Sequence, residues 1–345
     1  MTMKNIETGH LSRFRGELMG AAMLFIMCFH VYLPRTDAFY GLYRMGNIGV
    51  DIFFFLSGIG LWYSWTKMRE GAATPKAPFA RDYASFQRRR LLRIYPVWLL
   101  VAGSFYTYDY FTHGGHSNTL ADLFGDILIN WDFWLHDEPT FWYIPATMML
   151  YLFAPPYMEL IRKHPLYRWL PLVAVMWCVV VQWVTPVHTA VGHIEIFWSR
   201  IPIFLIGINM AEAVRRKDTL EGSALVLLLL LFLFPLSTSI WLEQVRHGKF
   251  PLFVERMLYI PLTVSGLLLL TRVLDGALQW LNRGLRFVGG ISLEVYLLHV
   301  QFVLVHLEKL GWGYWPKALA CIAITLPLAW VLHQAVDKLM KRLHL

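Results

Sequence analysis

Three titratable side chains of this sequence lie within or beside long hydrophobic runs. His30 stands near the end of the first run, Asp51 near the start of the second and His299 within the ninth. An ionisable group in apolar surroundings is costly, so each is a functional hypothesis. An imidazole accepts or releases a proton near neutral pH, which suits acid–base chemistry. The ordinary alternatives are histidines bonded to a carbonyl or a neighbouring helix, and an acidic residue stabilising a first helical turn.

A basic cluster, Arg88-Arg89-Arg90-Leu91-Leu92-Arg93, precedes the third hydrophobic run. Arg90 and Arg93 are three residues apart and share one face if the segment is helical. Guanidinium groups match phosphate oxygens, so the cluster is a candidate phosphate clamp. Anchoring by the positive-inside rule explains the same residues, and on physical grounds alone it is the favoured interpretation.

The composition shows what must position these residues. Of the 345 residues, 57% are hydrophobic and only 16% are charged, against about 25% charged in soluble domains. A crossing helix needs roughly 20 mostly apolar residues. The sequence therefore predicts an all-α, polytopic membrane protein of about ten helices. The predicted spans lie near residues 17–33, 46–65, 94–111, 141–161, 169–185, 196–214, 223–241, 257–271, 287–306 and 314–336.

The distribution of Lys and Arg predicts the orientation of these spans. Placing both termini inside collects 23 of the 31 basic residues on the inner side. The connection 112–140 contains no Lys or Arg and carries five acidic residues, as an outer segment would. The formal net charge of +8 therefore reflects topology and not nucleic-acid binding. We predict that both termini are cytoplasmic.

The predicted spans place the three titratable groups at one depth. At 1.5 Å per residue, His30 lies about 22 Å above Arg15 and His299 about 20 Å above Arg286. Asp51 opens a descending span and should lie at a similar level. The sequence thus predicts one slab, nearer the outside, that contains all three groups.

Neither the cysteines nor the remaining histidines indicate a metal site. Cys28, Cys178 and Cys321 all fall in predicted spans and lack any paired spacing. His113 and His116 have a possible ligand spacing, but no third ligand is evident. We expect no metal, and a single membrane domain over residues 1–345 without an appended soluble domain.

Five motifs give the sequence a family resemblance. They are Arg15-Gly16-Glu17-Leu18-Met19-Gly20 running to Phe29-His30, Gly49-Val50-Asp51-Ile52-Phe53-Phe54-Phe55-Leu56-Ser57-Gly58, Arg89-Arg90-Leu91-Leu92-Arg93-Ile94-Tyr95-Pro96, Phe141-Trp142-Tyr143-Ile144, and Ile291-Ser292-Leu293-Glu294-Val295-Tyr296-Leu297-Leu298-His299. With these five motifs in this order, the sequence resembles the acyltransferase 3 family of bacterial membrane O-acyltransferases.

The resemblance implies a donor and a catalytic residue. The donor would be cytoplasmic acyl-CoA, usually acetyl-CoA, and the first-span histidine, here His30, would be catalytic. The family's Arg-x-x-Arg pair matches Arg90 and Arg93. Its basic residue eleven positions before the histidine falls on Met19 here, and Arg15 lies one turn earlier. We take Arg15, Arg89, Arg90 and Arg93 as the candidate donor-binding residues.

The resemblance also implies an acceptor hydroxyl on the outer face, on a surface glycan or lipid-linked sugar. His30 would act as base or as acyl carrier, with Asp51 and His299 as further catalytic candidates. Aromatic rings stack on sugars, although interfacial belts explain them equally. The candidate substrate-binding residues are Trp142, Tyr143, Ser57 and Glu294. For an oxyanion partner, the candidates are Ser57, Ser292, Tyr143 and Asn130.

A transporter is the competing interpretation. His30 and Asp51 would then form a proton relay for export of a polysaccharide or lipid intermediate. Transporters often contain inverted repeats, and we detect none. An acyl-CoA enzyme needs phosphate-binding arginines at its cytoplasmic mouth, whereas a glycan exporter does not. We expect an acyltransferase in the bacterial cytoplasmic membrane, in contact with membrane lipid.

Overall fold

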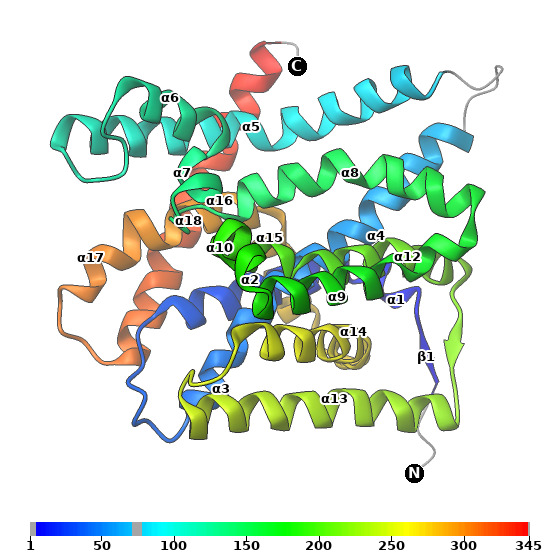
Figure 1. Ribbon diagram of the computed structural model, residues 1–345. Coiled ribbons are helices and arrows are strands. Elements are labelled where there is room, and N and C mark those ends of the chain that lie inside the picture. The colour runs from blue at the N-terminus through cyan, green and yellow to red at the C-terminus, as the bar shows by residue number, and fades with distance from the viewer. Residues whose placement is uncertain (1–4, 71–77, 344–345) are drawn as a thin grey trace.

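The computed structural model describes residues 5–70 and 78–343, and its layout is shown in Figure 1. The described residues are almost entirely helical. The principal helices are α2 (Arg15–His30), α4 (Ile48–Glu70), α5 (Phe79–Thr112), α8 (Tyr143–Lys163), α9 (Leu170–Trp183), α12 (Ile201–Arg216), α13 (Ser223–Trp241), α14 (Leu252–Gly276), α15 (Gln279–Gly290), α16 (Ser292–Leu298) and α18 (Tyr314–Arg342).

Shorter elements connect the principal helices. They are β1 (Ile6–Glu7), α1 (His10–Arg13), α3 (Tyr40–Arg44), η1 (Met45–Asn47), α6 (Leu120–Ile129), α7 (Trp131–Leu135), η2 (Pro165–Trp169), α10 (Thr185–Val191), η3 (Gly192–Ile194), α11 (Glu195–Trp198), β2 (Thr219–Leu220), η4 (Leu242–Arg246), η5 (His299–Leu304) and α17 (Val305–Glu308). The two strands pair antiparallel, with Ile6 opposite Leu220. This pairing holds the N-terminal segment beside the α12–α13 connection.

The helices are those of a multi-pass membrane protein. Within the described residues, five helical segments are long and apolar enough to cross a bilayer, or up to seven if each of two bent pairs forms one span. All ten predicted runs fall largely on helices. The all-helical class is therefore confirmed, while the count of ten and the orientation stay predictions.

Helix α2, which carries His30, packs closely against α15. A Cβ atom at Gly20 would lie 1.9 Å from the carbonyl oxygen of Leu285, and one at Gly289 would lie 2.0 Å from that of Gly16. Small residues spaced by four allow such backbone contact between membrane helices. The Gly16–Gly20 spacing thus fixes α2 against the segment that leads to His299.

The ninth predicted span is not one straight helix. The segments Gln279–Gly290 and Ser292–Glu308 are bent by 64° relative to each other, and Ile291 stands at the break. The helix then widens into a π-helical stretch, η5, that begins at His299. Glycine pairs and π-bulges are common causes of helix bends, and π-bulges often occur at functional sites. Hydrophobicity alone does not predict this break.

The connection 112–140 is folded and not an open loop. Thr119 and Asp122 form a reciprocal capping box at the start of α6. The helix lies against α5, where the Tyr95 hydroxyl donates to the Leu128 carbonyl and the Trp98 indole donates to that of Ile127 at 2.8 Å. Figure 1 shows α6 and α7 stacked beside one end of α5. The segment forms a cap on this end of the bundle.

Candidate active site

The structure brings His30 and His299 into direct contact. His30 is the last residue of α2 and His299 is the first of η5. Nε2 of His299 lies 3.1 Å from Nδ1 of His30, and the ring centroids are 4.9 Å apart. His299 is 1% exposed, whereas His30 retains exposed surface. The predicted coincidence of depth for these two residues therefore corresponds to a contact.

The hydrogen-bond partners define the tautomer of each ring. Nδ1 of His299 lies 3.0 Å from the Val295 carbonyl oxygen and 2.8 Å from that of Tyr296. Carbonyl oxygens only accept, so this nitrogen carries the proton and Nε2 of the neutral ring is an acceptor. Nδ1 of His30 lies 2.9 Å from the Ile26 carbonyl oxygen and also faces Nε2 of His299. It must therefore carry the proton of His30.

This assignment leaves Nε2 of His30 with a free lone pair. No hydrogen-bond partner for Nε2 is found among the described residues. An exposed imidazole nitrogen without a proton is the atom that a general base or an acyl-accepting nucleophile uses. His299 holds the other side of the ring and thereby fixes the direction of Nε2.

Two tyrosines fix the end of α2 that presents His30. The Tyr43 hydroxyl donates to the Phe29 carbonyl at 2.7 Å, and the Tyr314 hydroxyl donates to that of Cys28 at 3.0 Å. The carbonyls of a last helical turn have no partner within the helix. These two bonds satisfy them and hold the turn in place.

A chamber of about 90 Å³ lies on the same side of α2 as the histidines. Arg15, Met19 and Ile26 line it from α2, and at 100° per residue they share one face with His30. Tyr296, whose carbonyl accepts from His299, also lines it. The chamber thus adjoins both imidazole rings through the residues that bind them.

The chamber is basic. Arg15 and Arg93 both line it, and its lining contains no acidic side chain among the described residues. The other polar lining residues are Ser57, Tyr143, Thr147, Tyr151, Ser292 and Tyr296. Two guanidinium groups without a carboxylate in the lining suit a phosphorylated ligand. Arg15, one helical turn before Met19, thus places a basic group in the chamber, although Met19 stands at the position where the family has its basic residue.

The other arginines of the basic cluster have different surroundings. Arg90 donates to the Ser64 hydroxyl and its guanidinium stacks 5.0 Å from the Phe86 ring. Arg89 is exposed and contacts the sulfur of Met68. Of the predicted pair, only Arg93 lines the chamber. The structure therefore pairs Arg93 with Arg15 and places Arg90 against α4.

Asp51 lies in a separate buried network. Its Oδ2 is 2.7 Å from Nη1 of Arg200, and both residues are 0% exposed. Arg200 also contacts Asn47, and the nearby Arg256 pairs with Glu195 at 2.8 Å. No hydrogen bond joins Asp51 to either histidine among the described residues. Asp51 therefore forms an ion pair that joins α4 to Arg200, the residue directly before α12.

Glu294 is also directed away from the histidine pair. Its Oε1 lies 2.8 Å from Nδ1 of His333 on α18. The catalytic candidate Asp51 and the substrate-binding candidate Glu294 thus make no hydrogen bond to the histidine pair among the described residues. The bonds that orient the two rings come from backbone carbonyls and from the rings themselves.

The remaining sequence candidates divide between the chamber and the cap. Ser57 and Tyr143 line the chamber. Trp142 packs with Phe54 and Phe133 at centroid distances of 6.3 and 6.2 Å. Asn130 is buried and donates to the Thr140 carbonyl at 2.7 Å, which makes it part of the cap. The described residues contain no group of three potential metal ligands.

Sequence reasoning missed Arg200, Tyr151 and Tyr296. Arg200 lies near the start of the predicted span 196–214, and the rule that identified His30 applies equally to it. Tyr151 and Tyr296 carry no comparable signal, because tyrosines are ordinary residues in aromatic-rich membrane helices.

These features define a class: a multi-pass helical membrane protein with a histidine pair beside a basic chamber. The family comparison makes the class specific. Residues 20–334 match the family model of the acyltransferase 3 family, described as an acyltransferase domain. The chain belongs to this family and is a membrane acyltransferase.

One curated relative matches over part of the chain. It is the "Regulator of hypoxia-inducible factor 1" of Caenorhabditis elegans, 29% identical over 159 residues. The match covers 39% of this chain and 29% of that protein. No solved structure matches. The family assignment therefore depends on the family model and not on a characterised relative.

Proposed function

We propose that this protein transfers a short acyl group, most simply acetyl, from cytoplasmic acyl-CoA to a hydroxyl group beyond the membrane. The acceptor is a cell-surface glycan or a lipid-linked sugar, and the site of action is the bacterial cytoplasmic membrane. One observation carries the proposal: a histidine with an unprotonated, exposed nitrogen stands beside a chamber lined by Arg15 and Arg93.

The donor would enter through the basic chamber. A nucleotide bearing phosphates binds at the arginine-rich entrance, where Arg15 and Arg93 supply charge-assisted hydrogen bonds. The pantetheine arm then extends along the shared face of α2, past Met19 and Ile26, toward His30. The narrow chamber favours an extended chain with a small acyl group over a bulky one.

The reaction needs one proton acceptor and one leaving group. Nε2 of His30 takes the proton of the acceptor hydroxyl as its oxygen attacks the thioester carbonyl. The C–S bond breaks, and the thiolate of CoA recovers the proton from the imidazolium. In the covalent alternative, Nε2 attacks the thioester carbonyl, the C–S bond breaks, and the CoA thiolate leaves an acyl-histidine behind. The acceptor oxygen then attacks the acyl carbon, the C–N bond breaks, and the hydroxyl proton passes to the thiolate. The same free lone pair serves both routes.

The test is donor binding and turnover with radiolabelled acetyl-CoA in nanodiscs. We expect saturable binding and slow release of acetate from the wild-type protein. The double variant Arg15→Gln/Arg93→Gln should bind acetyl-CoA at least about tenfold more weakly, because each lost phosphate contact costs on the order of 1.4 kcal/mol. Arg89→Gln is the matched control, since Arg89 lies outside the chamber, and it should bind normally.

Absence of binding by a well-folded wild-type protein would contradict the proposal and favour the export of a glycan or lipid intermediate. Equal weakening by Arg89→Gln and by the double variant would contradict the assignment of Arg15 and Arg93. It would instead indicate that only the overall positive charge matters.

A further inference from the structure

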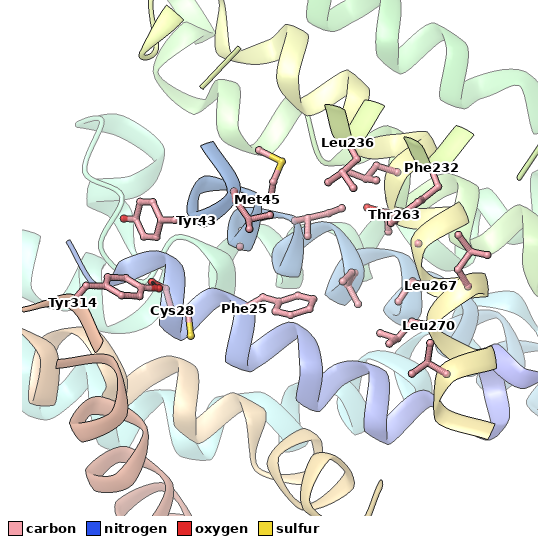
Figure 2. A pocket seen from close by; sticks show the side chains of 18 residues that line it. Phe25, Cys28, Tyr43, Met45, Phe232, Leu236, Thr263, Leu267, Leu270 and Tyr314 are labelled. Atoms are coloured by element: carbon pink, nitrogen blue, oxygen red, sulfur yellow. Dashed lines mark hydrogen bonds between the residues drawn. The ribbon is translucent and has the colours of Figure 1, made fainter. Parts of the chain in front are cut away.

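Two apolar grooves of similar size flank the helical bundle. The α2–α14 groove, of about 640 Å³, is lined mainly by α2, α3, α4, α13 and α14. Figure 2 shows its lining, with Cys28, Tyr43 and Tyr314 at one end and Leu267 and Leu270 at the other. The α5–α8 groove, of about 710 Å³, is lined by α5, α6, α7 and α8. Neither lining contains a charged side chain among the described residues.

The grooves differ in their relation to the chamber. Ile144 lines both the chamber and the α5–α8 groove, so the two spaces adjoin at this side chain. The lining of the α2–α14 groove shares no residue with that of the chamber. On α2, Cys28 faces this groove and Ile26 faces the chamber, because two residues at 100° each turn to nearly opposite sides. Of the two grooves, the α5–α8 groove is the one whose lining shares a residue with that of the chamber.

The wall between groove and chamber consists of two isoleucines. Ile94 of α5 and Ile144 of α8 both line the chamber, and both are buried. The next residues along each helix, Tyr95 and Pro145, line the groove. A contact between two apolar side chains can open by rotamer changes without breaking a hydrogen bond. The wall is therefore suited to act as a lateral gate.

The cap covers one end of the α5–α8 groove. Leu128 and Ile129 of α6 and Trp131 of α7 line that end. The hydrogen bonds of Tyr95 and Trp98 to α6 fix the cap in place. A ligand thus reaches the groove from the bilayer more directly than through the cap.

The aromatic side chains of the lining have their polar atoms turned to the protein. The Tyr95 hydroxyl and the Trp98 indole donate to carbonyls of α6, and the indole nitrogen of Trp131 is buried. A Cβ at Gly125 would lie 2.6 Å from Cε3 of Trp131, so this indole packs on α6. The lining therefore offers an apolar surface, which suits a hydrocarbon chain.

We propose that the α5–α8 groove binds the hydrocarbon chain of the acceptor, which is a membrane lipid with a hydroxylated headgroup. This inference rests on the proposed acyl transfer and narrows its acceptor to the lipid-linked class. The chain lies among Tyr95, Trp134 and Met148, and the headgroup passes between Ile94 and Ile144 toward Nε2 of His30. A soluble sugar lacks the chain that the groove would hold.

The test uses dodecyl glucoside with a diazirine in its alkyl chain, which is a hydroxylated lipid of minimal size. A phosphatidylcholine with the same diazirine is the comparison probe. Each is photo-crosslinked to the protein in nanodiscs, and the adducts on both grooves are counted by mass spectrometry. We expect the glucoside, relative to the phospholipid, to be enriched about tenfold in the α5–α8 groove and not in the α2–α14 groove.

Matched substitutions fill one groove at a time. Met148→Trp should abolish the enrichment, whereas Leu270→Trp in the α2–α14 groove should preserve it. Neither residue lines the chamber, so both variants should still bind acetyl-CoA and release acetate. If the wild-type protein neither binds acetyl-CoA nor releases acetate, the proposed function itself is overturned. Intact donor reactions with identical adduct patterns for the two probes would overturn only the groove assignment, since the groove would then hold ordinary lipid.

Discussion

Two pairs of titratable side chains, Asp51 with Arg200 and His30 with His299, are arranged in opposite ways. Asp51 and Arg200 are both 0% exposed and form a direct ion pair. His30 and His299 contact each other, and Nε2 of His30 has no hydrogen-bond partner among the described residues. The first pair neutralises its charges inside the bundle. The second leaves free the nitrogen that the proposed reaction uses.

This difference shows that the energetic cost of placing an ionisable residue in a membrane span does not by itself identify a catalytic residue. Sequence reasoning weighs His30, Asp51 and His299 alike because each is an expensive residue in a span. The structure separates them by their partners. A charge that is neutralised within a buried ion pair stabilises the fold, whereas an unpartnered imidazole nitrogen on an exposed residue is available for chemistry.

The largest expected effect comes from removing the imidazole of His30, which carries the unbonded Nε2. His30→Ala should lower kcat for acyl transfer by about 10²–10⁴-fold, the usual contribution of a general base. Donor affinity should stay near the wild-type value because His30 does not line the basic chamber. Steady-state kinetics beside acetyl-CoA binding measures both. A His30→Ala protein that binds acetyl-CoA poorly but keeps a normal kcat would contradict the catalytic role and assign His30 to donor binding.

Removing the Asp51–Arg200 ion pair should lower the stability of the fold and leave the rate of acyl transfer unchanged. Asp51→Asn leaves Arg200 buried without a counter-charge, which costs about 3–5 kcal/mol. Thermal unfolding in detergent should show this loss, and the double variant Asp51→Leu/Arg200→Met should recover much of it. Activity per folded molecule should remain close to wild type. A stable Asp51→Asn protein that is inactive would give Asp51 a catalytic role after all.

His299 should have an intermediate effect because it acts through His30. His299→Leu removes one of the two acceptors of the Nδ1 proton of His30, and we expect kcat to fall by about tenfold, equivalent to one lost hydrogen bond. His299→Gln restores an acceptor oxygen and should recover part of the rate. Equal losses in the two variants would indicate a packing role alone. The KM for the donor should change in neither.

The smallest effect concerns the cap. Burial raises the pKa of the Asp126 carboxyl to about 6. The folded state then binds more protons than the unfolded chain, so the stability of the cap should fall as pH rises from about 4 to 6. Asp126→Asn should remove this dependence while keeping a partner for Ser117. Hydrogen exchange of the α6 amides across this range measures it, and an unchanged pH dependence would refute the assignment.

Much of the fold follows from sequence because a bilayer imposes simple rules. Apolar runs of sufficient length must be helical to satisfy their backbone groups, and every predicted run falls largely on helix. The break at Ile291 and the folded cap do not follow, because both depend on contacts between distant segments. The Gly20–Leu285 approach and the Trp98–Ile127 hydrogen bond are two such contacts.

The candidate site was predictable in part for the same reason. The depth argument places His30 and His299 at one level, and the structure joins them. It places Asp51 at that level too, but depth does not specify which way a helix face points. The partners of Asp51 and Glu294, Arg200 and His333, lie 149 and 39 residues away along the chain. Such pairings need the three-dimensional arrangement.

The most direct test of the account is the protonation state of His30 in the resting protein. Nitrogen-15 NMR of histidine-labelled protein in nanodiscs distinguishes the two neutral tautomers from the imidazolium, and His30→Ala assigns the signal. We predict a neutral ring with a proton on Nδ1 and none on Nε2, and the same tautomer in His299→Leu, because the Ile26 carbonyl still accepts the Nδ1 proton. A proton on Nε2 in the wild type would contradict the account, because His30 would then have no free nitrogen to accept the acceptor's proton.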